Sequence, residues 1–253
     1  MVEVNMNKKW FYFIITNFIT LLRVIGIFAL IPVYKNFGGL ACFLLSSFCF
    51  LTDCLDGLLA RKLQSSTFFG SLFDALSDKA FLVVNMFLLM SMTEFAIIPI
   101  LLELSIAMVQ SYKYEKQMNI QANIIGKTKM WVAGICISLS YILLDQRFIN
   151  SLGLLGNQIK QIPEAGLLSI VLVPLVLSEI VTLISYIVEY FGFKHQMTVD
   201  SLQKKAQEEE KIMQAMREIS LKDLMFNHKY YEIYKDQGNL KLIRSLAKRN
   251  KEK

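Results

Sequence analysis

The stretch FLTDCLDGLLARKLQSSTFFGSLFDALSDKAF, residues 50–81, places four aspartates in a sequence that is otherwise apolar enough for membrane helices. They are Asp53, Asp56, Asp74 and Asp78. The flanking segments LACFLLSSFCFLT and FLVVNMFLLMSM are almost wholly apolar. An ionised carboxylate in such surroundings is costly, and it persists only when it is paired, bound to a cation or facing a water-filled cavity. The stretch therefore predicts a functional site, with a cation site as the leading hypothesis.

The spacing of these residues places them on two helix faces. Residues three, four or seven positions apart share one face of an α-helix. The first face consists of Asp53, Asp56, Gly57 and Ala60, and the second of Gly70, Asp74 and Asp78. A short loop joins the two helices, so we expect antiparallel neighbours with these faces opposed. The glycines and the alanine leave room for a flat or bulky group against the backbone.

The residue types narrow the chemistry. Four close carboxylates cannot all ionise unless cations neutralise them. Ligand sets made of oxygen alone favour hard ions such as Mg²⁺, Mn²⁺ or Ca²⁺. Arg61 follows directly and could bind a phosphate or hold an aspartate. Together these features suggest a displacement at phosphorus, with a pair of metal ions clamping a pyrophosphate.

Other charged residues of the apolar part leave alternatives open. A single aspartate in a membrane helix serves about as often as a helix-pairing group or a proton relay as it does as a metal ligand. Arg23 and Glu103 could each be a buried charge partner or a site residue. We expect Glu179 to be structural or interfacial, as we do Glu189. Lys79 is expected to snorkel or to neutralise a carboxylate.

The composition predicts an all-α polytopic membrane protein. The chain has 253 residues, of which 54% are hydrophobic, which excludes an ordinary soluble domain. The four cysteines fall in apolar segments, so reduced thiols are expected. We predict an interfacial helix around KKWFYFI (residues 8–14) followed by six transmembrane helices. These span residues 18–33, 38–59, 70–92, 95–112, 129–144 and 165–191.

Loop charges orient this arrangement. The segments predicted to be cytosolic contain Lys8, Lys9, Arg61, Lys62, Lys113, Lys116, Lys127, Lys129 and Lys194, and the opposite side contains Lys35, Arg147 and Lys160. This distribution follows the positive-inside rule and places both termini in the cytosol. The aspartates then lie near the cytosolic side of an integral membrane protein.

The chain divides into a membrane domain, residues 1–193, and a polar extension, residues 194–253. The extension holds most of the net charge of +6. Its apolar residues recur at helical spacing, which predicts one or two cytosolic amphipathic helices with a break near Gly238. A charged extension without chemistry of its own is the expectation. We predict no nucleic-acid partner, because no groove-reading motif accompanies the basic residues.

The aspartate pattern D-x2-D-G-x2-A-R-x8-G-x3-D-x3-D resembles the signature of the CDP-alcohol phosphatidyltransferases. The segment TNFITLLRVIGIFALIPVY, residues 16–34, is similar to the opening helix of the phosphatidylglycerophosphate synthase and cardiolipin synthase branch. The resemblance implies a homodimer of six-helix subunits in the lipid bilayer, here a bacterial cytoplasmic membrane. It also implies transfer of a phosphatidyl group from CDP-diacylglycerol to a small alcohol, with release of CMP.

The resemblance also implies a role for each signature residue. Asp53, Asp56 and Asp74 would bind two divalent ions, Mg²⁺ or Mn²⁺, and Asp78 would complete the metal site. Asp78 would also act as the general base on the acceptor hydroxyl. The nucleotide would be admitted by Gly57, Ala60 and Gly70, with Arg61 supporting the site.

The acceptor is predicted from a second segment, ANIIGKTKMW, residues 122–131, which resembles a lysine-containing stretch of phosphatidylglycerophosphate synthases. Lys127 and Lys129 could bind the phosphate of glycerol 3-phosphate, although ordinary positive-inside lysines would look the same. Met130 and the pair Leu102–Glu103 depart from the pattern of that branch. A cardiolipin synthase or an enzyme with another acceptor is the alternative, and a cation or proton-coupled transporter is the hypothesis from a different class.

Overall fold

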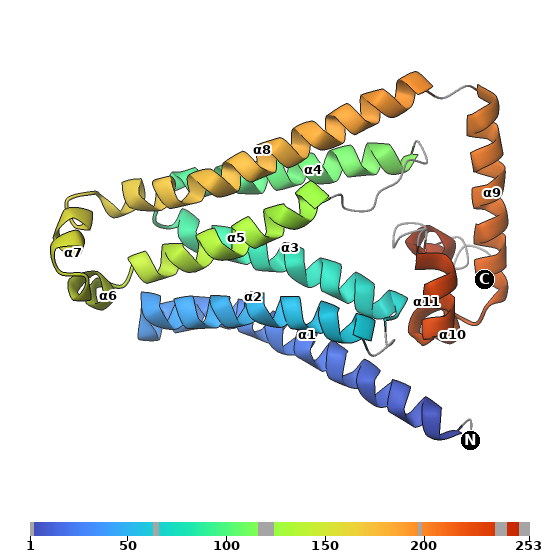
Figure 1. The fold of residues 1–253 in the computed structure, drawn as a ribbon, viewed down its shortest axis with the longest axis horizontal. Coiled ribbons are helices and arrows are strands. Elements are labelled where there is room, and N and C mark those ends of the chain that lie inside the picture. The colour runs from blue at the N-terminus through green and yellow to red at the C-terminus, as the bar shows by residue number, and fades with distance from the viewer. Residues whose placement is uncertain (1–2, 63–65, 116–123, 197–198, 236–241, 248–253) are drawn as a thin grey trace.

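The protein is all-helical in the part of the chain that the structure describes (Figure 1). The structure is a computed structural model, which describes the backbone of residues 3–62, 66–115, 124–196, 199–235 and 242–247. Within these ranges it describes the side chains except at residues 3–13, 15–16, 53–62, 114–115, 124, 193–196, 199–203 and 205–206.

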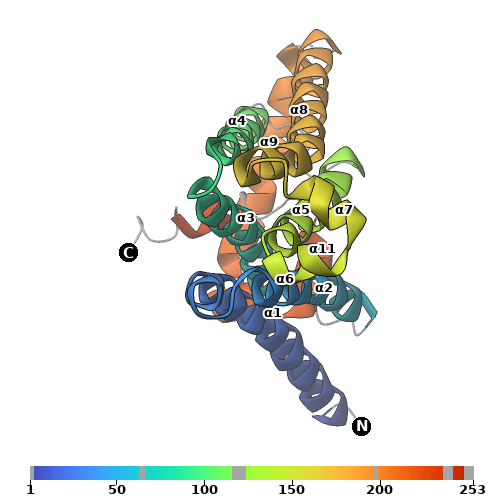
Figure 2. The same cartoon turned by 90° about the vertical axis from the view of Figure 1, so that its left-hand side faces the viewer.

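Six long helices precede the extension in the described part of the chain. They are α1 (Glu3–Phe37), α2 (Gly39–Lys62), α3 (Phe68–Met90), α4 (Ile97–Glu115), α5 (Ile124–Leu143) and α8 (Glu164–Gln196). Short helices join them, namely η1 (Glu94–Ala96), α6 (Gln146–Ser151) and α7 (Leu154–Ile159). The helix α1 packs against α2 and α3, α2 against α5, and α8 against both α4 and α5 (Figures 1 and 2).

Three described helices are long and apolar enough to cross a membrane: Asn17–Phe37, Glu94–Lys113 and Glu164–Gly192. This supports the prediction of an integral membrane protein, whereas the count of six spans is not confirmed. The separate interfacial helix is not confirmed either, because α1 runs from Glu3 to Phe37 without a break.

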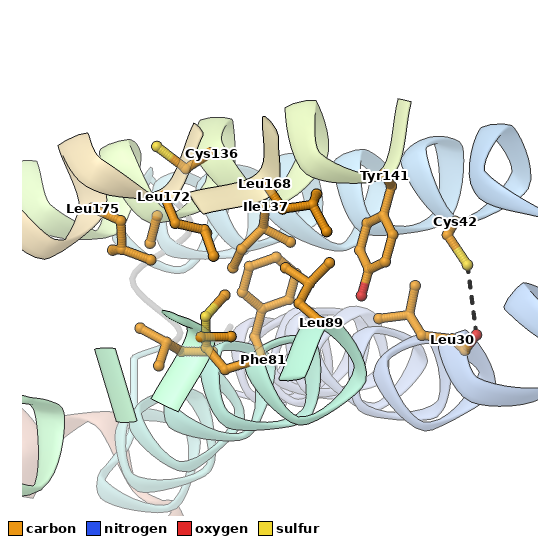
Figure 3. Packing of buried hydrophobic residues seen from close by; sticks show 14 of the residues in the cluster. Leu30, Cys42, Phe81, Leu89, Cys136, Ile137, Tyr141, Leu168, Leu172 and Leu175 are labelled. Atoms are coloured by element: carbon orange, nitrogen blue, oxygen red, sulfur yellow. Dashed lines mark hydrogen bonds between the residues drawn. The ribbon is translucent and has the colours of Figure 1, made fainter. Parts of the chain in front are cut away.

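In the described part of the chain, one apolar core lies between most of the long helices. It is formed by residues of α1, α2, α3, α5 and α8, among them Leu30, Phe81, Ile137 and Leu172 (Figure 3). Tyr141 brings a polar group into this core, and its hydroxyl donates to Asn85 Oδ1 at 2.9 Å. Polar groups in an apolar bundle must be satisfied internally, so this bond fixes α5 against α3.

At the far end of the bundle from the extension, Asp145 joins two helices. Its Oδ1 accepts from the backbone N–H groups of Arg147 at 2.9 Å and Phe148 at 3.1 Å, which caps α6. Its Oδ2 accepts from the N–H of Leu40 in α2 at 3.0 Å. The two chain segments approach closely because Gly39 has no side chain: a Cβ there would lie 2.5 Å from the carbonyl oxygen of Tyr141.

We expect Asp145→Asn to lower the free energy of unfolding by roughly 1 to 2 kcal/mol, the usual contribution of a capping carboxylate. Burial alone would raise the pKa of Asp145, but the hydrogen bonds from Leu40, Phe148 and Arg147 outweigh it and lower the pKa. The stabilisation is therefore complete above the usual aspartate pKa of about 4 and is lost as the pH falls through the folded-state pKa.

The measurement is thermal unfolding of purified wild-type and Asp145→Asn protein at a series of pH values. The difference in Tm should shrink as the solution becomes more acidic. Glu94→Gln, which removes an exposed carboxylate, is the matched control. A difference that persists unchanged into acid would contradict the role of the Asp145 charge.

Candidate functional site

The first aspartate of α3 lies nearly two turns after the start of the helix at Phe68. Thr67 caps α3, and its side chain accepts from the N–H of Gly70 at 3.1 Å. Asp74 and Asp78 follow at successive turns on the same face. A Cβ at Gly70 would lie 3.3 Å from Thr67 Oγ1 and 3.6 Å from Asn17 Oδ1, so α1 passes close to this face.

Arg23 of α1 holds the two α3 aspartates. Its side chain is 1% exposed, Nη2 donates to Asp74 Oδ1 at 2.7 Å, and Nη1 lies 3.4 Å from Asp78 Oδ1. The same guanidinium donates to the hydroxyl of Ser77. A planar guanidinium presents several donors in a rigid fork, so one arginine can orient carboxylates from two turns of a helix. Arg23 is therefore a buried charge partner of the two aspartates that the sequence predicts as metal ligands.

A second charged group lies where α3, α4 and α5 meet. Glu103 of α4 accepts from Lys79 of α3 at 3.2 Å and from Lys129 of α5. Lys129 is buried, whereas Lys127 is exposed. Lys79 and Lys129 also interact electrostatically with Asp78. The two α3 carboxylates predicted to bind metal and one lysine predicted to bind the acceptor thus belong to one charged cluster.

Glu179 of α8 also belongs to this cluster. Its side chain is 0% exposed, it interacts electrostatically with Lys129 and Glu103, and within the described residues neither of its carboxylate oxygens has a hydrogen-bond partner. The sequence predicts a structural or interfacial role for both Glu179 and Glu189. Glu189 forms an ion pair with Lys113 at 2.7 Å.

The α2 half of the site lies outside the described side chains. The backbone of α2 is helical as predicted, but the helix ends at Lys62 and not at the predicted residue 59. The side chains of the residues predicted there are not described, and these residues are Asp53, Asp56, Gly57, Ala60 and Arg61. Opposed acidic faces of α2 and α3 therefore stay a prediction.

A divalent cation fits the chemistry of the described donors. Asp74 and Asp78 supply hard oxygen ligands. Their side chains are 41% and 29% exposed, so a cation can reach both carboxylates although Arg23 is buried. Among the described residues, no group of three or more His, Cys, Asp or Glu side chains could by itself hold a metal ion. The metal site predicted from the sequence includes the two α2 aspartates as well.

With this geometry in place, comparison with known proteins assigns the class. The family model of the CDP-alcohol phosphatidyltransferases matches residues 13–177, so the chain belongs to that family. The match includes α1 with Arg23, both acidic helices and Lys129.

Two relatives in the family carry the same name, CDP-diacylglycerol–glycerol-3-phosphate 3-phosphatidyltransferase. The Pseudomonas fluorescens protein is 39% identical over 82 residues, 30% of this chain and 40% of the relative. The Mycoplasma genitalium protein is 35% identical over 135 residues, 47% of this chain and 56% of the relative. The matches thus cover only about half the length of these relatives.

We expect Arg23→Gln to lower the free energy of unfolding by about 2 kcal/mol, because it leaves Asp74 and Asp78 close together without their counter-charge. The estimate is below the value for a fully buried pair because Asp74 is partly exposed. Adding Asp78→Asn to Arg23→Gln should recover part of the loss, since it removes one of the two repelling charges.

The measurement is thermal unfolding of the single and double variants in detergent without added metal. Lys79→Gln removes a half-exposed cation from the neighbouring pair with Glu103 and is the control, with an expected change within about 0.5 kcal/mol. Equal stabilities of wild type and Arg23→Gln would show that the arginine does not offset the carboxylate charge.

Proposed function

We propose that this protein transfers a phosphatidyl group from CDP-diacylglycerol to glycerol 3-phosphate, which produces phosphatidylglycerophosphate and CMP. The observation that carries the proposal is the pair Asp74–Asp78, held by the buried Arg23 and joined electrostatically to Lys129 in a chain of this family. The name shared by the two relatives supports glycerol 3-phosphate as the acceptor.

In this proposal, the carboxylates of α2 and α3 bind two divalent ions, Mg²⁺ or Mn²⁺. The ligands are Asp53, Asp56, Asp74 and Asp78. When bound, the ions supply positive charge that offsets the diphosphate of CDP-diacylglycerol. Gly57, Ala60 and Gly70 leave space for the nucleotide, and Arg61 supports it.

Asp78 acts as the general base. It accepts the proton of the acceptor hydroxyl while that oxygen forms a bond to the phosphorus that carries the diacylglycerol. The bond from this phosphorus to the bridging diphosphate oxygen breaks, and CMP leaves with the electron pair. Arg23 keeps the Asp78 carboxylate oriented on the face of α3 that it shares with Asp74. The membrane domain has no histidine through residue 193, so a carboxylate is the natural proton acceptor there.

Lys127 and Lys129 bind the phosphate of the acceptor. Lys127 is exposed, so the acceptor phosphate meets it first. Lys129 is buried and donates a hydrogen bond to Glu103. Glu103 keeps Lys129 pointed at the cluster and offsets its charge before the acceptor arrives. This arrangement favours an anionic acceptor that carries its own phosphate.

In the same proposal the chain crosses the membrane six times, acts as a homodimer and presents the site to the cytosol. The distribution of loop lysines supports this orientation. CDP-diacylglycerol and a water-soluble acceptor can then meet at the inner face of the bilayer.

The decisive experiment measures CMP release by purified protein with CDP-diacylglycerol, Mg²⁺ or Mn²⁺, and one acceptor at a time. We expect Asp78→Asn to lower kcat by roughly 10²- to 10⁴-fold, the usual contribution of a general base, with the fold retained. Glycerol 3-phosphate should give the phosphatidylglycerophosphate product by thin-layer chromatography. If CMP is released with phosphatidylglycerol or inositol phosphate but not with glycerol 3-phosphate, the proposed acceptor is wrong. If Asp78→Asn keeps full activity, Asp78 is not the general base.

We expect Lys129→Met to raise the KM for glycerol 3-phosphate at least about tenfold, because a hydrogen bond to a charged group contributes about 1.5 kcal/mol or more. The KM for CDP-diacylglycerol should stay close to that of the wild type. Lys127→Met is the matched variant at the exposed position and should have a smaller effect. An equal rise in both KM values for Lys129→Met would indicate a general disturbance of the site and not an acceptor contact.

A further inference from the structure

The C-terminal extension packs against the start of α3. It consists of α9 (Val199–Glu218), α10 (Leu221–Phe226), α11 (His228–Tyr234) and the helical residues 242–247, and Figure 1 shows α10 and α11 beside the α2–α3 end of the bundle. Phe68, the first residue of α3, is 1% exposed and lies in one apolar cluster with three buried residues of the extension. These are Met216, Leu224 and Leu242. The membrane domain thus contributes a residue to the core of the extension.

Aromatic contacts continue from this cluster toward the acidic face. The ring of Tyr231 meets Phe68 edge-on with centroids 5.5 Å apart, and Phe226 lies 5.2 Å from Phe69. Phe69 in turn stacks on Phe73 at 5.9 Å. Phe73 immediately precedes Asp74 in the chain. A row of ring contacts therefore leads from Phe226 of the extension through Phe69 to the residue next to a predicted metal ligand.

A polar contact fixes the loop that leads into α3. The Nδ1 of His228 lies 2.8 Å from the carbonyl oxygen of Ser66, and because a carbonyl only accepts, the ring nitrogen donates. Ser66 precedes Thr67, the residue that caps α3. The extension therefore contacts α3 both before its cap and along its first turns.

We infer that the C-terminal extension positions the active site by holding the first turns of α3, and with them Asp74 and Asp78, against Arg23. Helix ends fray unless something ties them down, and α3 begins only a few residues before its first aspartate. The extension supplies apolar, aromatic and hydrogen-bonding contacts at that end. Its effect on turnover rests on the proposed function, but its effect on the shape and cation affinity of the acidic face does not.

The test uses full-length Phe226→Ala, which removes the ring against Phe69. We expect hydrogen exchange of the backbone amides in residues 66–73 to rise by about fivefold, the order of magnitude of one lost aromatic contact. The dissociation constant for Mn²⁺, measured by electron paramagnetic resonance titration, should rise by a similar factor of about five. Exchange in α5 and α8 should not change, because these helices do not carry the contact.

Two further variants separate positioning from general disruption. His228→Ala should shift both measurements in the same direction, and His228→Asn should restore part of the effect, because the amide can donate to Ser66. Ile233→Ala is the matched control: Ile233 lies on α11 but is 55% exposed, so both measurements should match the wild type. The histidine variants retain all buried residues of the apolar cluster and remove only the ring that stacks on Tyr231, so they keep the test valid if Phe226→Ala fails to fold.

Unchanged Mn²⁺ affinity in variants whose residues 66–73 exchange faster would overturn the inference, because the extension would then pack on α3 without positioning the aspartates. Unchanged exchange in both Phe226→Ala and His228→Ala would overturn it as well. If the wild type binds Mn²⁺ but releases no CMP with any acceptor, the proposed function fails while the shifts in exchange and Mn²⁺ affinity still support the positioning role.

Discussion

The arrangement of the site depends on the cost of placing carboxylates in an apolar helix bundle. Asp74 and Asp78 repel each other on neighbouring turns of α3, and the buried guanidinium of Arg23 offsets that repulsion from α1. Because the arginine approaches from the buried side, the carboxylates stay accessible on their other side. The same contact joins α1 to α3, so it stabilises the fold and orients the predicted metal ligands together.

Charge balance also explains why residues from five helices gather at one place. Lys79 and Lys129 form ion pairs with Glu103 and interact electrostatically with Asp78, and Glu179 of α8 interacts electrostatically with Lys129. Opposite charges in the cluster offset one another, whereas Asp74 repels Asp78 and Glu103 repels Glu179. This coupling brings the aspartates that we propose for the nucleotide side near the lysine that we propose for the acceptor.

The C-terminal extension shares an apolar cluster with the membrane domain. Polar residues and helical periodicity predict a cytosolic helical extension after residue 193. In the structure α8 continues to Gln196, and Phe68 of α3 lies in one apolar cluster with residues of the extension. The extension has more described helices than the one or two predicted, and the break expected at Gly238 lies outside the described residues. Its aromatic residues contact the first turns of the acidic helix, so its packing and the site geometry are linked.

The sequence by itself determined the properties that depend on local periodicity. The apolar runs predicted most ends of the long helices to within four residues. The exceptions are the start of α1, which begins at Glu3, the start of α5 and the end of α8. The spacing of Gly70, Asp74 and Asp78 predicted their common face. It did not decide their partners. Arg23 is 51 positions from Asp74, and His228 is 162 positions from Ser66. Only the tertiary structure decided these contacts, because helix packing, and not periodicity along the chain, selects which faces meet.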